Sequence, residues 1–183
     1  MASNASRGLF FEQLALDLEA RLTPDREDSL YAAGFTDGEG CISVNRYPGS
    51  GTFRAQIVIQ VTTLPVLEWL RDRWGGKIYA ANPAGVRRRQ QSWQWAINRD
   101  QQQLDFLMDV RPFLKVKGEV VDNALAFLRL KMAGGWRRSE ADNAALLELV
   151  VVHRQFGVER ERRRLALASE WDAKHAESKT EAV

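Results

Sequence analysis

Two carboxylates separated by glycines, in the run Asp37-Gly38-Glu39-Gly40, are the side chains of this sequence best placed for chemistry. Glycines at these positions permit a helix to end and the chain to turn directly into a strand, which would hold Glu39 at the helix end. An acid at a helix end is more often only solvated. The spacing alone therefore leaves open whether Glu39 is a surface residue or part of a site.

A helix that carries these acids is predicted to begin at Pro24, because Thr23 is suited to the N-cap and Pro to the first helical position. Small side chains on one of its faces would allow a second helix to approach closely, so we expect this face to be an interface between two helices. The residues expected at that interface are Leu30, Ala33, Gly34 and Asp37.

After Gly40 the apolar residues change from helical spacing to alternation. Strands are predicted over 41–47 and about 53–62, and again over about 77–81 and 90–97. Helices are predicted over 64–74, 101–110 and 117–132, each followed by Gly or Pro. The order helix, two strands, helix, two strands, helix predicts an α+β fold, with one antiparallel sheet that carries helices on one face.

The other face of this sheet is predicted to be open and polar. Its side chains are long amides, basic residues, Ser and Tyr, with no acid, and almost all can hydrogen-bond to base edges or phosphates. An ordinary solvated face would carry more Lys, Glu and Thr of mixed sign, so the composition favours nucleic acid. The residues expected to bind DNA are Asn45, Tyr47, Arg54, Gln56, Gln60, Lys77, Tyr79, Arg87, Arg88, Gln90, Ser92 and Gln94.

Charge is segregated along the chain, although the formal net charge is only +2. Residues 1–40 carry three basic and eight acidic side chains, whereas residues 41–99 carry nine basic and two acidic ones. A positive segment of this density suits a surface that binds a polyanion. The single Cys41 cannot form an internal disulfide, and no apolar run is long enough to span a membrane, so we expect an intracellular protein in a reducing compartment.

The run from Ala32 to Gly40, followed by the apolar strand Ile42-Ser43-Val44, resembles the motif of the LAGLIDADG homing endonucleases. The sequence contains one copy, as in the single-motif branch of the family, whose members act as homodimers. The resemblance implies that Glu39, with Gly38 beside it, holds the catalytic metal, although Asp is more usual there. A second segment, Pro112 to Lys117, is similar to the stretch before the last core helix of these enzymes, which implies that Lys117 reaches the active site.

The resemblance further implies a Mg²⁺-dependent enzyme, in which Mn²⁺ is expected to substitute, that breaks both strands of a long, near-palindromic double-stranded DNA site as a homodimer. A metal-activated water would attack the phosphate. The alternative is a non-cleaving protein of the same fold, either a maturase that binds intron RNA or a DNA-binding regulator. No membrane partner is expected.

Residues 1–135 are expected to form the endonuclease core, with an additional amphipathic helix over 8–22. Residues 136–183 are expected to form added helices packed on the same domain. Leu146, Leu149 and Val150 form an apolar stripe whose next helical position is His153, which we interpret as a structural residue. The Arg-rich run of residues 160–164 is interpreted as a solvated face that could touch phosphates outside the core site.

Overall fold

The computed structural model describes residues 24–47, 49–82, 91–135 and 138–180, so the N-terminal helix expected over residues 8–22 lies outside it. The described chain contains a 4-stranded antiparallel sheet in the order β1-β2-β4-β3. The strands are β1 (Gly40–Arg46), β2 (Phe53–Val61), β3 (Lys77–Asn82) and β4 (Ser92–Ile97). Both expected hairpins are confirmed.

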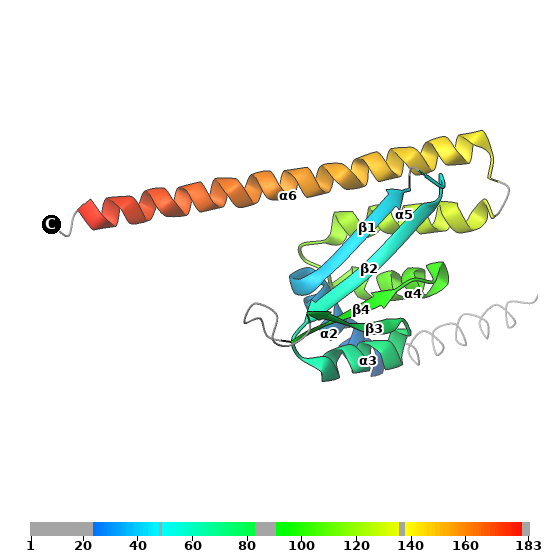
Figure 1. Ribbon diagram of the computed structural model, residues 1–183, viewed down its shortest axis with the longest axis horizontal. Coiled ribbons are helices and arrows are strands. Elements are labelled where there is room, and N and C mark those ends of the chain that lie inside the picture. Colours follow the sequence, from blue (N-terminus) through cyan, green and yellow to red (C-terminus); the bar gives the residue numbers. More distant parts are fainter. Residues whose placement is uncertain (1–23, 48, 83–90, 136–137, 181–183) are drawn as a thin grey trace, which may run out of the picture.

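Helices alternate with the strand pairs in the expected order, which confirms the α+β fold class (Figure 1). The helices are α2 (Pro24–Glu39), α3 (Leu64–Trp74), α4 (Asp100–Val110), a short 3-10 turn η1 (Arg111–Phe113), α5 (Gly118–Ala133) and α6 (Glu140–Thr180). Helix α3 ends where predicted, because Gly75 at φ 75° follows it and its N–H bonds back to the carbonyl of Arg71.

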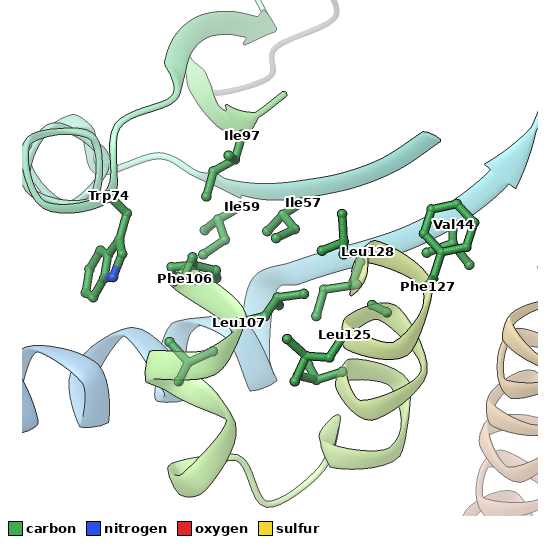
Figure 2. Close-up of a cluster of buried hydrophobic side chains, with 14 of the residues drawn as sticks. Val44, Ile57, Ile59, Trp74, Ile97, Phe106, Leu107, Leu125, Phe127 and Leu128 are labelled. Atoms are coloured by element: carbon green, nitrogen blue, oxygen red, sulfur yellow. The ribbon is translucent and has the colours of Figure 1, made fainter. Parts of the chain in front are cut away.

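The core lies between one face of the sheet and the helices that cover it. Figure 2 shows Ile57 and Ile59 of β2 facing Phe106 and Leu107 of α4, and all four side chains are at most 1% exposed. The alternation along β2 therefore has the predicted direction, with apolar residues turned to the helices. Gln103 fastens α4 to the sheet, since its side-chain amide donates to two strand carbonyls, at 3.0 and 2.7 Å.

Helix α2 passes into β1 without a loop. The helix ends at Glu39 and the strand begins at Gly40. A Cβ atom at Gly40 would lie 2.5 Å from the carbonyl oxygen of Thr36, so only glycine permits so abrupt a change of direction. This junction fixes Glu39 at the boundary of helix and sheet, as predicted, although only Gly40 is needed for it, because Gly38 is helical and a Cβ atom there would meet nothing within 4 Å.

The C-terminal extension is one helix of 41 residues, α6, rather than the several helices expected. Figure 1 shows α6 running alongside β1 and α5 and then projecting beyond the rest of the chain. Leu146 and Val150 are buried, whereas every described side chain from Gly157 onward is exposed. Neither α6 nor any other helix in the described part of the chain has an apolar stretch suited to crossing a bilayer.

Candidate active site and DNA-binding face

The two acids at the end of α2 have different environments. The carboxylate of Asp37 accepts hydrogen bonds from three consecutive backbone N–H groups, of Lys115 at 2.7 Å, Val116 at 3.2 Å and Lys117 at 2.9 Å. Glu39, two residues further on, is exposed at the helix end. Asp37 therefore holds the segment before α5, which leaves Glu39 as the acid available for a ligand.

Lys117 joins the start of α5 to the end of α2. Its Nζ atom donates to the carbonyl oxygens of Thr36 at 2.6 Å and Asp37 at 2.7 Å, which are among the last carbonyls of α2. An ammonium has three N–H groups, so one remains for water or a phosphate oxygen. The Lys117 that the sequence placed in the active site is thus next to the end of the motif helix.

The charge of Lys117 is set by its surroundings. Burial lowers the pKa of its ammonium below the ordinary value, and the guanidinium of Arg160 on α6 lowers that pKa further. The carboxylates of Asp37 and Glu39 act in the opposite direction. Two chain segments far apart in sequence, α2 and α6, therefore both bring charged groups close to Lys117.

The four residues expected at a helix interface are divided between two faces of α2. Leu30 is 56% exposed and Gly34 is also exposed, so both are open to a partner. Ala33 is only 1% exposed, and Asp37 is engaged by the segment before α5, so these two contact their own chain. The expectation that Ala33 faces a partner is corrected, because its side chain is buried in the core of its own chain, whereas for Asp37, which is partly exposed, that expectation stays a prediction.

The outer face of α2, which we define as Glu27, Leu30, Tyr31, Gly34, Phe35, Gly38 and Glu39, lines an open hollow of about 540 Å³. Tyr31 is 54% exposed. The centre of its ring lies 5.0 Å from the ring centre of Phe35 and 5.2 Å from that of Trp69. Tyr31 and Phe35 were not among the residues expected at this interface. Their spacing of three or four positions from Glu27, Gly34 and Gly38 could have indicated that all these residues share one face of the helix.

Exposed polar side chains gather on the sheet face opposite the helices. The strand register places Asn45 beside Arg54, and Gln60 beside Gln94, whose other neighbour is Tyr79. Alternation along each strand puts these side chains on the same face. The expected residues that are exposed are Tyr47, Arg54, Gln56, Gln60, Lys77 and Tyr79, and those that are half-buried are Asn45 and Gln94.

Three details modify the expected DNA-binding set. Ser92 is only 6% exposed and its hydroxyl accepts a hydrogen bond from Gln60 at 3.1 Å, so it positions an amide instead of presenting a free hydroxyl. The guanidinium of Arg54 lies 5.2 Å from the ring centre of Tyr47, which restricts its motion over the face. Arg87, Arg88 and Gln90 lie outside the described residues.

Comparison with solved structures places this architecture among DNA-bound homing endonucleases. The archaeal intron-encoded homing endonuclease I-Vdi141I, complexed with DNA, aligns with a TM-score of 0.57 and 18% identity over 70% of this chain and 82% of its own. The homing endonuclease I-CvuI, in complex with its target and Ca, aligns with a TM-score of 0.56 and 16% identity over 73% of this chain and 82% of its own.

A longer protein has the same fold. The LAGLIDADG meganuclease I-AabMI, bound to uncleaved DNA, aligns with a TM-score of 0.54 and 16% identity over 67% of this chain but only 43% of its own. No family model matches the chain, and no curated protein matches its sequence. The chain therefore has the LAGLIDADG homing endonuclease fold, with a sequence that has diverged widely from these neighbours.

Proposed function

We propose that this protein is a site-specific DNA endonuclease that acts as a homodimer and makes a double-strand break with the help of a divalent cation. The observation that carries the proposal is that the Lys117 ammonium is hydrogen-bonded to the last carbonyls of α2, where the exposed Glu39 ends the helix and acts electrostatically on Lys117. Glu39 and Lys117 both lie at the point where α2 passes into the sheet. The face of this sheet that the helices do not cover carries the polar side chains. The DNA-bound neighbours of this fold support the same reading.

The outer face of α2 supports the homodimer. One chain offers one Glu39, and cutting two DNA strands requires two such sites. Leu30 and Tyr31 are each more than half exposed on a face with no bulk at Gly34, so a second copy of α2 can approach closely. The alignment covers most of the I-CvuI chain but less than half of the I-AabMI chain, as expected if two copies of this chain correspond to one longer protein.

The residues at the end of α2 fit a hard divalent cation. Within the described part of one chain, no three His, Cys, Asp or Glu side chains lie close enough together to hold a metal. The Glu39 carboxylate and the backbone at Gly38 offer oxygen atoms at an exposed helix end, and Mg²⁺ commonly completes its shell with water and phosphate oxygens. Bound there, Mg²⁺ or Mn²⁺ would supply an activated water and offset phosphate charge.

The chain's own residues have distinct roles in this proposal. Glu39 carries the negative charge that holds the cation, while the free N–H of Lys117 donates to the phosphate under attack, where negative charge develops. Asp37 positions Lys117 through the backbone of residues 115–117. The polar sheet face binds the flanking DNA, with Arg54 and Gln56 contributing to base choice.

Cleavage of a selected duplex tests this function. The wild-type protein would first select duplexes from a pool of random-sequence DNA in Ca²⁺, and the selected DNA would then be incubated with Mg²⁺, with Mn²⁺ or with chelator. We expect cleavage of both strands only with Mg²⁺ or Mn²⁺. Glu39→Gln keeps the size and polarity of the side chain but removes its charge, so cleavage should fall by orders of magnitude while binding persists.

Glu148→Gln is the matched control, because Glu148 is likewise an exposed glutamate on a helix but lies outside the outer face of α2, so it should leave cleavage unchanged. Cleavage that survived Glu39→Gln would move the active site elsewhere. A wild-type protein that binds the selected DNA but never cuts it would instead be a regulator. Selective binding of intron RNA in place of duplex DNA would indicate the maturase alternative.

A further inference from the structure

The side of α6 that faces the body of the protein changes character along its length. Its packed residues begin with the buried Leu146 and Val150 and continue with the half-buried His153 and Phe156, at steps of three or four residues. The next position of this stripe is Arg160. The apolar contact therefore ends in a guanidinium on the side of α6 that faces the body.

His153 fixes α6 in this register. Its Nε2 atom lies 2.9 Å from the carbonyl oxygen of Ile42 in β1, and its Nδ1 atom lies 3.2 Å from the side-chain amide oxygen of Asn123 in α5. Because β1 is an edge strand of the sheet, this contact also covers an otherwise open backbone group. About two turns later along α6, Arg160 is held near the beginning of α5.

A groove of about 200 Å³ separates α6 from the first turn of α5 at this point. Its charged lining residues are Lys117, Glu119, Glu159, Arg160 and Arg163. Arg163 is already paired with Glu159 at 3.1 Å, whereas Arg160 makes no ion pair among the described residues. The groove is thus lined by two cationic residues, Lys117 at the N-cap of α5 and Arg160 on α6.

Lys117 and Arg160 approach each other closely enough to interact unfavourably. Among the charged groups around Lys117, Arg160 has the largest effect, greater than the opposing effect of Asp37 or of Glu39, and it lowers the pKa of the Lys117 ammonium. Arg160 also lowers the pKa of His153. Two converging cations are stabilised when an anion binds between them.

We infer that Lys117 and Arg160 form a binding site for a backbone phosphate of the DNA, so that the C-terminal helix contributes directly to the cleavage site. This inference rests on the proposed function. A guanidinium can donate two parallel N–H groups to one phosphate, and the free N–H of Lys117 supplies a third contact from the other side of the groove. Arg160 is therefore a second cationic contact for DNA beside Lys117.

The test compares three full-length variants on the duplex selected by the wild-type protein. Arg160→Ala removes the proposed contact, whereas Arg160→Lys keeps the positive charge but lacks the two parallel N–H donors of the guanidinium. Arg162→Ala is the matched control, since this arginine is equally exposed but points about 200° away around the helix. Thermal unfolding of each variant shows whether α6 remains docked, because within the described residues Arg160 makes no hydrogen bond or ion pair that its removal would break.

Two readouts separate binding from cleavage. We expect Arg160→Ala to slow single-turnover cleavage in Mg²⁺ by about 10²-fold, the loss typical of one donor to a developing charge. In Ca²⁺, the slope of log affinity against log salt concentration should become shallower by about 0.9 for each subunit. Arg160→Lys should recover most of the salt slope and part of the rate, whereas Arg162→Ala should match wild type in both.

The outcomes distinguish this inference from the proposed function. If the wild-type protein binds DNA without cutting it, and Arg160→Ala still changes the salt slope, the endonuclease proposal is wrong and the phosphate site stands. Wild-type cleavage with an unchanged rate and slope in Arg160→Ala would overturn the phosphate site alone. Equal losses of cleavage rate and salt slope in Arg160→Ala and Arg162→Ala would mean that Arg160 acts only through general electrostatic attraction, which overturns the phosphate site. A wild-type protein that binds no DNA would overturn both the phosphate site and the endonuclease proposal.

Discussion

Asp37 and Lys117 each bind the backbone of the other's chain segment. The Asp37 carboxylate accepts the N–H of Lys117 at 2.9 Å, while the Lys117 ammonium donates to the carbonyl oxygen of Asp37 at 2.7 Å. The pair ties the end of α2 to the start of α5 across 80 positions of sequence. The contact fixes the segment that carries Lys117 against the end of α2 that carries Glu39, so the geometry of the candidate site depends on an acid that need not touch DNA.

Replacing Asp37 by Ala is expected to lower both stability and cleavage. Three backbone N–H groups lose a charged acceptor, and hydrogen bonds to charged groups contribute about 1.5–3 kcal/mol each, less where water can replace the acceptor. Because Asp37 is partly exposed, we expect a loss of about 1–3 kcal/mol in the free energy of unfolding. Urea denaturation measures this loss, and Glu39→Gln should show none of it. Unchanged stability in Asp37→Ala would mean that the contact is not maintained in solution.

Gly34→Leu is expected to separate the homodimer without unfolding the chain. Outside its chain neighbours and the adjacent backbone of α2, a Cβ atom at Gly34 would meet no atom within 4 Å, so there is room for a side chain on one chain, but not against a closely packed second α2. Sedimentation should show a dimer for wild type and a monomer with a native circular dichroism spectrum for Gly34→Leu. Gly40→Ala is the contrasting variant, because its Cβ would clash with Thr36 and destabilise the fold itself. A wild-type monomer at micromolar concentration would contradict the homodimer.

Arg54→Ala is expected to change which base pairs the protein prefers. Arg54 is exposed on the polar sheet face and oriented by Tyr47, and loss of a bidentate base contact costs about 1–3 kcal/mol at the positions it reads. Arg88 lies between the two predicted strands of the second hairpin and is expected to bind phosphate, so Arg88→Ala should weaken binding to all sequences alike. Selection from random-sequence DNA in Ca²⁺ measures both effects. A profile unchanged by Arg54→Ala would remove Arg54 from base recognition.

Docking of α6 is expected to weaken in mild acid because of His153. Burial lowers the pKa of His153 below its ordinary value, an effect opposed by the hydrogen bond to the Ile42 carbonyl and strengthened by Arg160. The unfolded chain therefore takes up a proton more readily than the folded one, so stability is lost as the pH falls below about 6.5.

Thermal unfolding across this range measures the effect of His153, with His153→Gln as the control. Glutamine still donates to a carbonyl but does not titrate, so its melting temperature should change less between about pH 7.5 and pH 5.5, a range that spans the ordinary pKa of histidine. Both proteins keep His175, which cancels in the comparison. Equal pH dependence in the two proteins would show that His153 does not control the docking of α6.

Local sequence determined most of the core fold. The change from helical spacing to alternation at Gly40, the apolar alternation along β2 and the Gly or Pro that follows each core helix predicted elements that the structure reproduces within a few residues. These features depend on the periods of helix and strand and on conformations open mainly to glycine, all of which act within a few residues. For the same reason the sequence placed Glu39 at the end of α2.

The tertiary structure decided which face of α2 is open and what α6 does. Ala32, Ala33 and Gly34 are all small, so helical spacing could not indicate which of them packs on the sheet and which remains available to a partner. Arg160 belonged to a charge run that looked merely solvated, and only the packing of Leu146, Val150 and His153 against α5 and β1 brings it to Lys117. Such contacts join segments far apart in sequence, where shape and burial, rather than local periodicity, determine the neighbours.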